Sequence, residues 1–283
     1  MRVFRTTLLL AALTFFLMFV GQYLGGRNGM TVGLGIAIVT NAFAYFFSDK
    51  IALMTSGAKP VTREQLPRLY AVMERLAAKA NLPLPKLYVV PEAAPNAFAT
   101  GRNPRHASVA VTQGLLELMN DDELEGVIAH ELSHVRNYDI LISSVAATLA
   151  GAITWIAHWG PWLGGGDDER DRGGGGVLGI LLFFLAPLGA FLLQLGLSRQ
   201  REYSADETGA RMVGNPYGLI SALQKLGAYN NRIPTTAISP STSSLCIVRP
   251  LFGRGAVSSL FSTHPPLPDR IAKLRDMTIL PQR

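Results

Sequence analysis

The sequence predicts an α-helical integral membrane protein with four transmembrane helices and a mostly helical polar part that carries a small β-sheet. Two observations predict this class. The chain of 283 residues is 48% hydrophobic and only 16% charged, whereas an average soluble domain is about 25% charged. The apolar residues are concentrated in four long stretches, and the polar segments between them show helical periodicity or short β-type runs.

Residues 1–48 contain the first two of these stretches. Arg2 and Arg5 precede an apolar run from 6 to about 24, and a second run covers 30–47. The alternative for the first run is a signal peptide. We interpret it as an uncleaved anchor, because it is long and because no clear small-x-small cleavage site follows it. Residues 1–48 are therefore predicted to form two transmembrane helices.

Glycines in and between these two runs, and one asparagine in the second run, are compatible with helix–helix contact, although the glycine pattern is weak in a chain with 28 Gly. Gly21-x-x-x-Gly25 and Gly29-x-x-x-Gly33 have the spacing at which two membrane helices approach closely. Asn41 lies inside the second run, where a hydrogen bond between helices is a better interpretation than a catalytic role.

Residues 49–139 are predicted to be a polar part outside the membrane. An amphipathic helix is expected from about 62 to 80. Three short strands are expected at 86–90, 96–100 and 108–112, with a turn at 101–104. An exposed edge of this sheet can hold an extended peptide by β-augmentation. An ordinary edge strand has the same pattern, and the sequence does not separate the two.

A further helix is predicted from about 121 to 137. Asn120 and the acidic residues after it provide a good N-terminal cap and first turn. Apolar residues recur at helical spacing and form its buried stripe: Leu124, Val127, Ile128 and Leu132. The helix carries the sequence His-Glu-Leu-Ser-His from His130 to His134.

This motif has the chemistry of a metal hydrolase. Residues four apart on a helix share a face, so both imidazoles can reach one zinc ion at about 2.0–2.1 Å. Glu131 lies about 100° round the helix axis from His130 and is placed to act on water as a general base. Two ligands, a base and an open coordination position are what such an enzyme needs. The alternative is a pair of surface histidines on an acidic helix.

Residues 140–197 are predicted to form a transmembrane hairpin from two apolar runs, 140–159 and 177–197, joined by a glycine-rich acidic loop. Tryptophans near the end of the first run form an aromatic belt, and His158 belongs to it, where we expect no metal. The first run begins six residues after His134. At 1.5 Å per residue, the metal would lie about 9 Å from a membrane surface.

The hairpin returns the chain to the membrane face that it left. Glu202 follows the second run and can be the third zinc ligand of a His₂Glu set, with water in the fourth position. Asp206 lies one turn further on the same face, where it can accept a hydrogen bond from a ligand histidine and fix its tautomer. The alternative is an ordinary helix start whose carboxylates pair with Arg199 and Arg201.

The charges of the loops predict the topology. The net charge is +6, and the positive-inside rule places both termini and the motif in the cytoplasm. The opposite side holds Arg27 and the acidic loop at 164–176. The cytoplasmic side holds Arg2, Arg5, Lys50, Lys59, Arg63, Arg199 and Arg201. No nucleic-acid partner is expected, because no basic patch with interleaved aromatic residues is present. Cys246 is the single cysteine, which excludes an internal disulfide.

The segment 130–134, the hairpin and then Glu202 with Asp206 together resemble the HtpX-type membrane zinc metalloproteases, relatives of the CAAX prenyl endopeptidases. The resemblance covers essentially the whole chain. It implies a gluzincin-like catalytic domain with one zinc ion per chain. It also implies endoproteolysis of membrane or misfolded proteins in envelope quality control and stress response, in the inner membrane of a bacterial cell.

Two further segments match the same family. The sequence Pro-Asn-Ala-Phe-Ala at 95–99 resembles its edge strand, which implies that Asn96 contacts the backbone of the substrate. The sequence Ser-Thr-His-Pro-Pro at 262–266 resembles its late His-Pro segment, which implies that His264 lies in the cleft and stabilises the oxyanion. Without the resemblance, a lone histidine such as His264 is more often a capped surface residue.

Residues 198–283 are predicted to be the second cytoplasmic part of the catalytic domain. It contains a helix at about 210–229, a long loop over 231–261 that is rich in Ser, Thr and Pro, and a short helix near 266–274.

The expected function is therefore that of a zinc metalloendopeptidase acting on polypeptides at the cytoplasmic face of a membrane. One alternative is an intramembrane protease with its zinc inside the bilayer. The acidic run at 117–125 argues against it, because charge at bilayer depth is costly. The other alternative is a non-catalytic membrane scaffold or holdase with a structural metal or none. A structural site normally has four protein ligands, and the sequence offers three good candidates.

Overall fold

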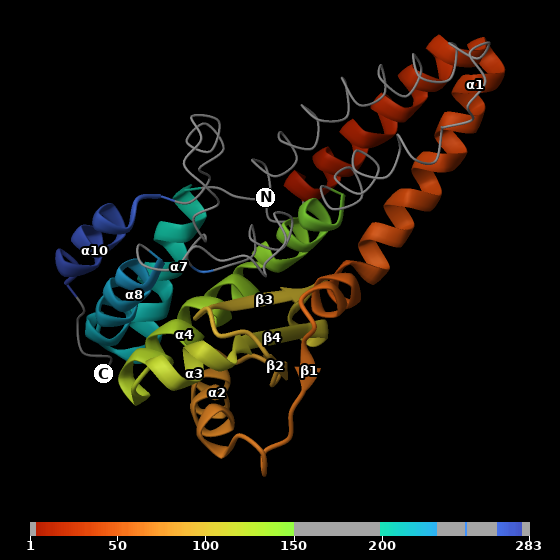
Figure 1. Ribbon diagram of the computed structural model, residues 1–283. Coiled ribbons are helices and arrows are strands. Elements are labelled where there is room, and N and C mark those ends of the chain that lie inside the picture. The colour runs from red at the N-terminus through yellow and green to blue at the C-terminus, as the bar shows by residue number, and fades with distance from the viewer. Residues whose placement is uncertain (1–3, 150–198, 231–246, 248–264, 279–283) are drawn as a thin grey trace, which may run out of the picture.

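The computed structural model describes residues 4–149, 199–230, 247 and 265–278. These residues are mostly helical and include one small sheet, as predicted. The elements are α1 (Phe4–Thr55), β1 (Lys59–Pro60), α2 (Pro67–Lys79), β2 (Lys86–Val90), β3 (Ala97–Gly101), the 3₁₀ helix η1 (Pro104–His106), β4 (Ala107–Thr112), α3 (Gln113–Leu118), α4 (Asp121–Asn137), the helix Asp139–Leu149, α7 (Arg199–Val213), α8 (Tyr217–Asn230) and α10 (Leu267–Arg275). In Figure 1, α1 projects away from the body formed by the sheet and the later helices.

The helix α1 is a hairpin of two apolar arms. The backbone departs from helical geometry at Gly25 and Gly26, and the φ of +58° at Gly26 is one that glycine tolerates best. Each arm is long and apolar enough to cross a membrane, over Thr6–Tyr23 and Gly25–Thr55. The two predicted N-terminal runs are thus helical. The second arm continues past residue 47 to Thr55, because no breaker precedes the turn that follows it.

Contacts between the two arms match the expectation for Gly21, Gly29 and Gly33, whereas a Cβ at Gly25 would meet no atom within 4 Å. Gly21 and Gly29 approach so closely that a Cβ on either would lie 2.1–2.2 Å from a carbonyl oxygen of the other. The amide of Asn41 donates to the carbonyl of Leu10 (3.1 Å) and to the hydroxyl of Thr14 (2.9 Å). The predicted interhelical hydrogen bond of Asn41 is confirmed.

The helix Asp139–Leu149 runs along this apolar hairpin. Its residues Leu141, Val145 and Leu149 pack against Leu9 and Leu13 of the first arm in one buried cluster. This helix is the start of the third predicted apolar run. The rest of that run and the whole fourth run lie outside the described residues. Four transmembrane helices were predicted. In the part of the chain that the structure describes, two helices are long and apolar enough to span a membrane.

The sheet has the strand order β1-β2-β4-β3. β2 and β4 are parallel, whereas β3 pairs with β4 in the antiparallel sense. The three predicted strands are confirmed to within one residue. The two-residue strand β1 was not predicted, because a pair such as Lys59-Pro60 has no strand periodicity. β3 lies at the end of the sheet and packs beside α4 (Figure 1).

The helix α4 lies at the centre of the body, between α2, α7, α8 and β3. Its bounds match the predicted 121–137. A capping box starts it: Asn120 Oδ1 accepts from the N–H of Glu123, and the carboxylate of Glu123 accepts from the N–H of Asn120. The stripe Leu124, Val127, Ile128 and Leu132 is fully buried. Burial of such a side chain contributes about 1.5–3 kcal/mol each.

The helix α7 approaches α4 closely at one glycine. A Cβ at Gly209 would lie 3.0 Å from the backbone nitrogen of His130, so the absence of a side chain lets the two helices pack tightly there. The predicted helix at 210–229 is instead the end of α7 followed by α8. The break falls at Gly214, whose φ is +102°. The Gly-Asn-Pro sequence at 214–216 indicates this turn, whereas the prediction relied on apolar periodicity alone. The short C-terminal helix is confirmed as α10.

Candidate metal centre

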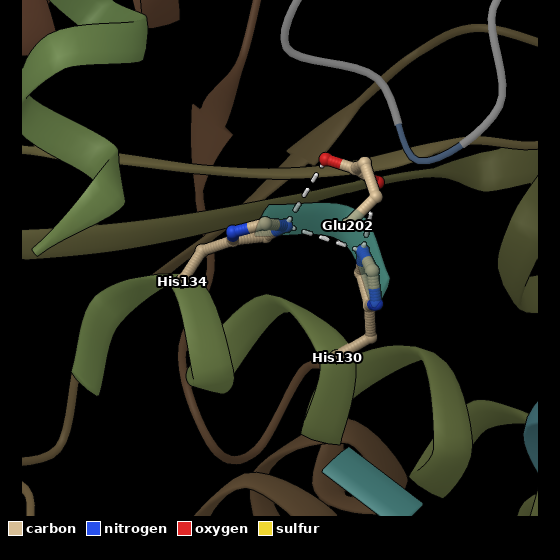
Figure 2. A group of neighbouring side chains, drawn as sticks. All are labelled: His130, His134 and Glu202. Atoms are coloured by element: carbon tan, nitrogen blue, oxygen red, sulfur yellow. Dashed lines mark hydrogen bonds and ion pairs between the residues drawn. The ribbon is translucent and has the colours of Figure 1, made fainter. Parts of the chain in front are cut away.

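Two histidines of α4 point their Nε2 atoms at the same place. His130 and His134 lie one turn apart, and their Nε2 atoms are 3.2 Å from each other (Figure 2). The ring planes are nearly perpendicular, at 88°. His130 is buried, whereas the side chain of His134 is 16% exposed. The face predicted from the four-residue spacing is therefore formed in the structure.

Glu202 completes the group from the first turn of α7. Its Oε2 lies 3.6 Å from His130 Nε2, and its Oε1 lies 3.6 Å from His134 Nε2. Ligand atoms of the three residues all lie within 4.8 Å of one another. A tetrahedral zinc with ligands at about 2.0–2.1 Å holds its donor atoms about 3.3–3.4 Å apart. The three residues thus fit one such ion with only small adjustments.

Each histidine has a carboxylate at its other ring nitrogen. His130 Nδ1 lies 2.9 Å from Asp206 Oδ1, and His134 Nδ1 lies 3.2 Å from Asp139 Oδ2. A carboxylate accepts the Nδ1 proton, which leaves the Nε2 lone pair as the donor. Two such lone pairs 3.2 Å apart, both facing the carboxylate of Glu202, repel unless a proton or a metal ion lies between them. The chemistry of the donor set therefore fits a metal ion.

Arg270 of α10 holds both oxygens of Asp206, and its Nη2 lies 3.5 Å from His130 Nδ1 at the oxygen that the two share. Its Nε donates to Asp206 Oδ2 (2.8 Å) and its Nη2 donates to Asp206 Oδ1 (2.6 Å). Arg270 is 1% exposed, and its Nη1 lies 3.7 Å from Glu202 Oε2. The predicted neighbour of the ligand histidine, Asp206, is thus in contact with His130. Arg270 was missed, since nothing in the sequence distinguishes it from other arginines on amphipathic helices.

The electrostatics of this side of the centre follow from burial and pairing. Burial alone would raise the pKa of Asp206, but the charge and hydrogen bonds of Arg270 lower it below its ordinary value. Burial alone would lower the pKa of His130, but the hydrogen bonds to Asp206 and Glu202 raise it to about 9 in the metal-free protein. A proton and a metal ion therefore compete for the same acidic pocket.

Glu131 lies on α4 next to His130, and its carboxylate faces the edge strand β3. It is 2% exposed. Burial raises the pKa of its carboxyl group, and the charges of His130 and His134 only partly oppose this effect. The backbone N–H of Ala99 on β3 also donates to the carboxylate. A buried carboxylate with a raised pKa is suited to accept a proton near neutral pH.

The edge strand β3 faces the centre with its backbone. Ala99 donates to Glu131, and the carbonyl oxygen of Ala97 accepts from the N–H of Ile247 at 3.2 Å. Asn96, expected to contact a substrate, lies just before this strand and is 3% exposed. Its Oδ1 accepts from the N–H of Ala97 at 2.8 Å. The structure thus places Asn96 beside the edge.

Two further residues bear on the centre, one that the sequence predicted and one that it did not. His264, expected to lie in the cleft, is outside the described residues. Asp139 was missed, because it stands at the start of an apolar run where it looked like a simple boundary residue. Its only signal was its position five residues after His134.

Comparisons with known proteins identify the family. The sequence model of peptidase family M48 matches residues 63–278. A protease HtpX homolog of Desulfatibacillum aliphaticivorans is 52% identical over 95% of this chain and 88% of its own length. Another, from Thermococcus sibiricus, is 49% identical over 96% of this chain and 94% of its own length.

A solved structure shares the fold. The crystal structure of S. mikatae Ste24p superposes with a TM-score of 0.53 and 18% sequence identity. The match covers 93% of this chain and 62% of that protein. The resemblance inferred from the motifs is confirmed by the relatives, and the scaffold alternative loses its basis. The chain belongs to peptidase family M48 and is a membrane metalloprotease.

Proposed function

We propose that this metalloprotease is a zinc-dependent endopeptidase in which His130, His134 and Glu202 hold the ion and Glu131 is the general base. The observation that carries the proposal is the convergence of three donor atoms from α4 and α7 (Figure 2). The buried carboxylate of Glu131 follows His130 on the same helix. Two imidazoles and one carboxylate are a set typical of catalytic zinc, which keeps a further position for water or substrate.

Each of these residues is proposed to have a separate role in the reaction. Zinc bound by this set would polarise the peptide carbonyl and lower the pKa of water toward 7. Glu131 takes the proton of the attacking water and passes it to the leaving amine, for which its raised pKa is suited. Asp206 orients His130 and keeps its Nε2 free. His264 is proposed to stabilise the oxyanion together with the metal.

The edge strand β3 is the proposed substrate-binding element. Its outer edge carries backbone groups of Ala97 and Ala99 that are directed toward the centre rather than toward β4. An extended peptide can pair with such an edge by replacing Ile247 and Glu131 as the partners of these backbone groups, and this places a peptide bond close to Glu131. Asn96, just before the strand, is proposed to bind the substrate backbone.

The proposed location is the cytoplasmic face of a bacterial inner membrane, in a multi-pass chain with four transmembrane helices. Asp139 lies five residues after His134 and is the first residue of a helix that packs on the apolar hairpin α1. The centre therefore lies close to the membrane. The distribution of basic residues supports a cytoplasmic orientation. Membrane or misfolded proteins are the proposed substrates, as part of envelope quality control.

One experiment tests the proposal directly. The full chain is purified in detergent, and zinc content and cleavage of an unfolded model protein are measured in the presence of inhibitors that do not chelate metal. Glu131→Gln is compared with the wild type and with Glu123→Gln, a matched change at another buried glutamate of α4. General-base catalysis contributes about 10²–10⁴-fold.

We expect one zinc per chain in all three proteins, with cleavage lost only in Glu131→Gln. Undiminished cleavage by Glu131→Gln would refute its role as the base. Absence of zinc from the wild type would refute the metal site. A second comparison, Glu202→Ala, should bind zinc more weakly, and unchanged zinc content would count against Glu202 as a ligand.

A further inference from the structure

An ion pair lies beside the centre, against His134. His134 Nδ1 is 3.2 Å from Asp139 Oδ2, and Asp139 Oδ1 is 3.8 Å from Arg201 Nη1. The side chains of His134, Asp139 and Arg201 are 16%, 15% and 13% exposed. The function proposed above uses His134 as a ligand but assigns no role to the two charged residues beside it.

The backbone between α4 and the next helix is shaped to bring Asp139 back to His134. Tyr138 has a φ of +62°, a left-handed conformation that few non-glycine residues adopt. Its N–H donates to carbonyls of His134 and Val135, which closes the end of α4. The helical geometry is interrupted there, and Asp139 starts the new helix with its carboxylate at the imidazole. Such conformations cost free energy and are retained where the surrounding structure requires them.

The pair connects the ligands to elements far apart in sequence. Asp139 is the first residue of the helix that packs on α1. Arg201 lies in the first turn of α7 and directly precedes Glu202. One ion pair therefore joins the end of the motif helix, the start of a membrane-side helix and the helix that supplies the third ligand.

We propose that Asp139 is a positioning residue for His134 and that Arg201 holds Asp139 in place, so that the affinity of the centre for metal depends on this pair. The carboxylate accepts the Nδ1 proton of His134, which fixes the ring and directs Nε2 toward the ion. Arg201 places its charge at the second oxygen of the same carboxylate. The proposal rests on the ligand role of His134 in the proposed function. Loss of such a partner typically lowers metal affinity about 10–100-fold.

The test measures zinc affinity of the full chain in detergent, by competition with a chromophoric chelator. Asp139→Ala removes the acceptor, whereas Asp139→Asn keeps an oxygen that accepts from Nδ1 and keeps a helix-capping side chain. Arg201→Gln removes the charge at Asp139. The control is Asp122→Ala, the same change at an exposed position in the first turn of α4. Thermal unfolding in the same detergent reports on the fold.

We expect Asp139→Ala to weaken zinc binding about 10–100-fold, Asp139→Asn to restore most of it, and Asp122→Ala to leave it unchanged. Arg201→Gln should weaken binding less. Combined with Asp139→Ala it should add nothing, because the pair acts through one contact. At saturating zinc, the kcat of Asp139→Ala should stay within a few-fold of the wild type, unlike that of Glu131→Gln.

The outcomes separate the two proposals. A wild type that cleaves and binds zinc, with equal affinity in Asp139→Ala, overturns the positioning role alone. A wild type without zinc overturns both. If Asp139→Ala does not fold, the affinity of Arg201→Gln decides, and an unchanged value refutes the role of the pair. Strictly additive effects of the two substitutions would also contradict it.

Discussion

Two glutamates on the same helix show how one environment stabilises a fold and another prepares a reaction. Glu123 and Glu131 lie on α4 and are each 2% exposed. The pKa of Glu123 is lowered, whereas that of Glu131 is raised. Burial raises both, so the difference comes from the groups around each carboxylate.

The carboxylate of Glu123 accepts hydrogen bonds from three donors. Lys225 Nζ lies 2.7 Å away, Ser221 Oγ donates at 2.6 Å, and the N–H of Asn120 donates at 2.9 Å. These contacts outweigh burial and keep the group ionised. They also fasten α8 to the start of α4. Glu131 faces two histidines and a backbone N–H instead; burial dominates, and the charge of Glu202 raises its pKa further. The fold thus leaves Glu131 ready to take a proton.

Asp206 shows that pairing decides the shift, rather than closeness to the centre. It contacts His130 directly, yet its pKa is lowered as that of Glu123 is, because Arg270 binds both of its oxygens. The centre therefore contains two kinds of buried carboxylate. Asp206, like Glu123, is a paired carboxylate with a lowered pKa, whereas Glu131 has a raised pKa.

The largest expected effect follows from breaking the Asp206–Arg270 pair. Arg270→Met leaves Asp206 buried without its cation, and loss of one partner of a buried ion pair costs about 3–5 kcal/mol. We expect the free energy of unfolding to fall by this amount in detergent titrations with denaturant. Arg275→Met, an exposed arginine in the last turn of the same helix, is the control and should change little. Equal effects of both substitutions would show that Asp206 does not need its partner.

A smaller effect is expected at the other paired carboxylate. Glu123→Gln removes the charge that Lys225 and Ser221 contact, and we expect a loss of about 1–3 kcal/mol of stability at neutral pH. Cleavage per folded molecule should stay unchanged, because Glu123 lies two turns from the ligands. Loss of specific activity greater than loss of folded protein would contradict this separation of roles.

The pH dependence of unfolding sharpens the same contrast. The folded pKa of Glu123 lies below its ordinary value of 4.5, so its contribution to stability is present above pH 4.5 and is lost as the pH falls through the lowered value. The melting temperature of the wild type should therefore fall in acid more steeply than that of Glu123→Gln. Parallel curves between pH 6 and pH 3 would argue that Lys225 and Ser221 do not stabilise the ionised form.

The sequence predicted what depends on local spacing. The bounds of α4 follow from Asn120 and the apolar stripe, and the shared face of His130 and His134 follows from the helical repeat. Glu202 could be placed only by assuming that a membrane hairpin returns the chain to its starting face. The structure brings Glu202 together with both histidines, and the hairpin itself lies outside the described residues.

The residues that support the ligands could not be predicted from the sequence. Arg270 reaches Asp206 from a helix 64 residues later, and only tertiary packing brings them together. Asp139 is close to His134 in sequence, but its contact depends on the left-handed backbone of Tyr138, which no propensity predicts for tyrosine. Buried polar partners are chosen by three-dimensional geometry, so periodicity carries no signal for them.

The smallest expected effect concerns the stability of the metal-free protein. Since burial raises the pKa of Glu131, its ionised form is disfavoured in the fold at neutral pH, and this cost grows as the pH rises above the ordinary value of 4.5. The neutral amide of Glu131→Gln avoids it. After chelation, we expect this variant to be more stable than the wild type by about 0.5–1 kcal/mol, the trade-off typical of residues kept for activity. Chelated samples unfolded at pH 7 measure the difference, with Glu123→Gln as the opposite case. A destabilised Glu131→Gln would mean that its carboxylate is held by contacts as complete as those of Glu123, and the distinction between the two glutamates would fail.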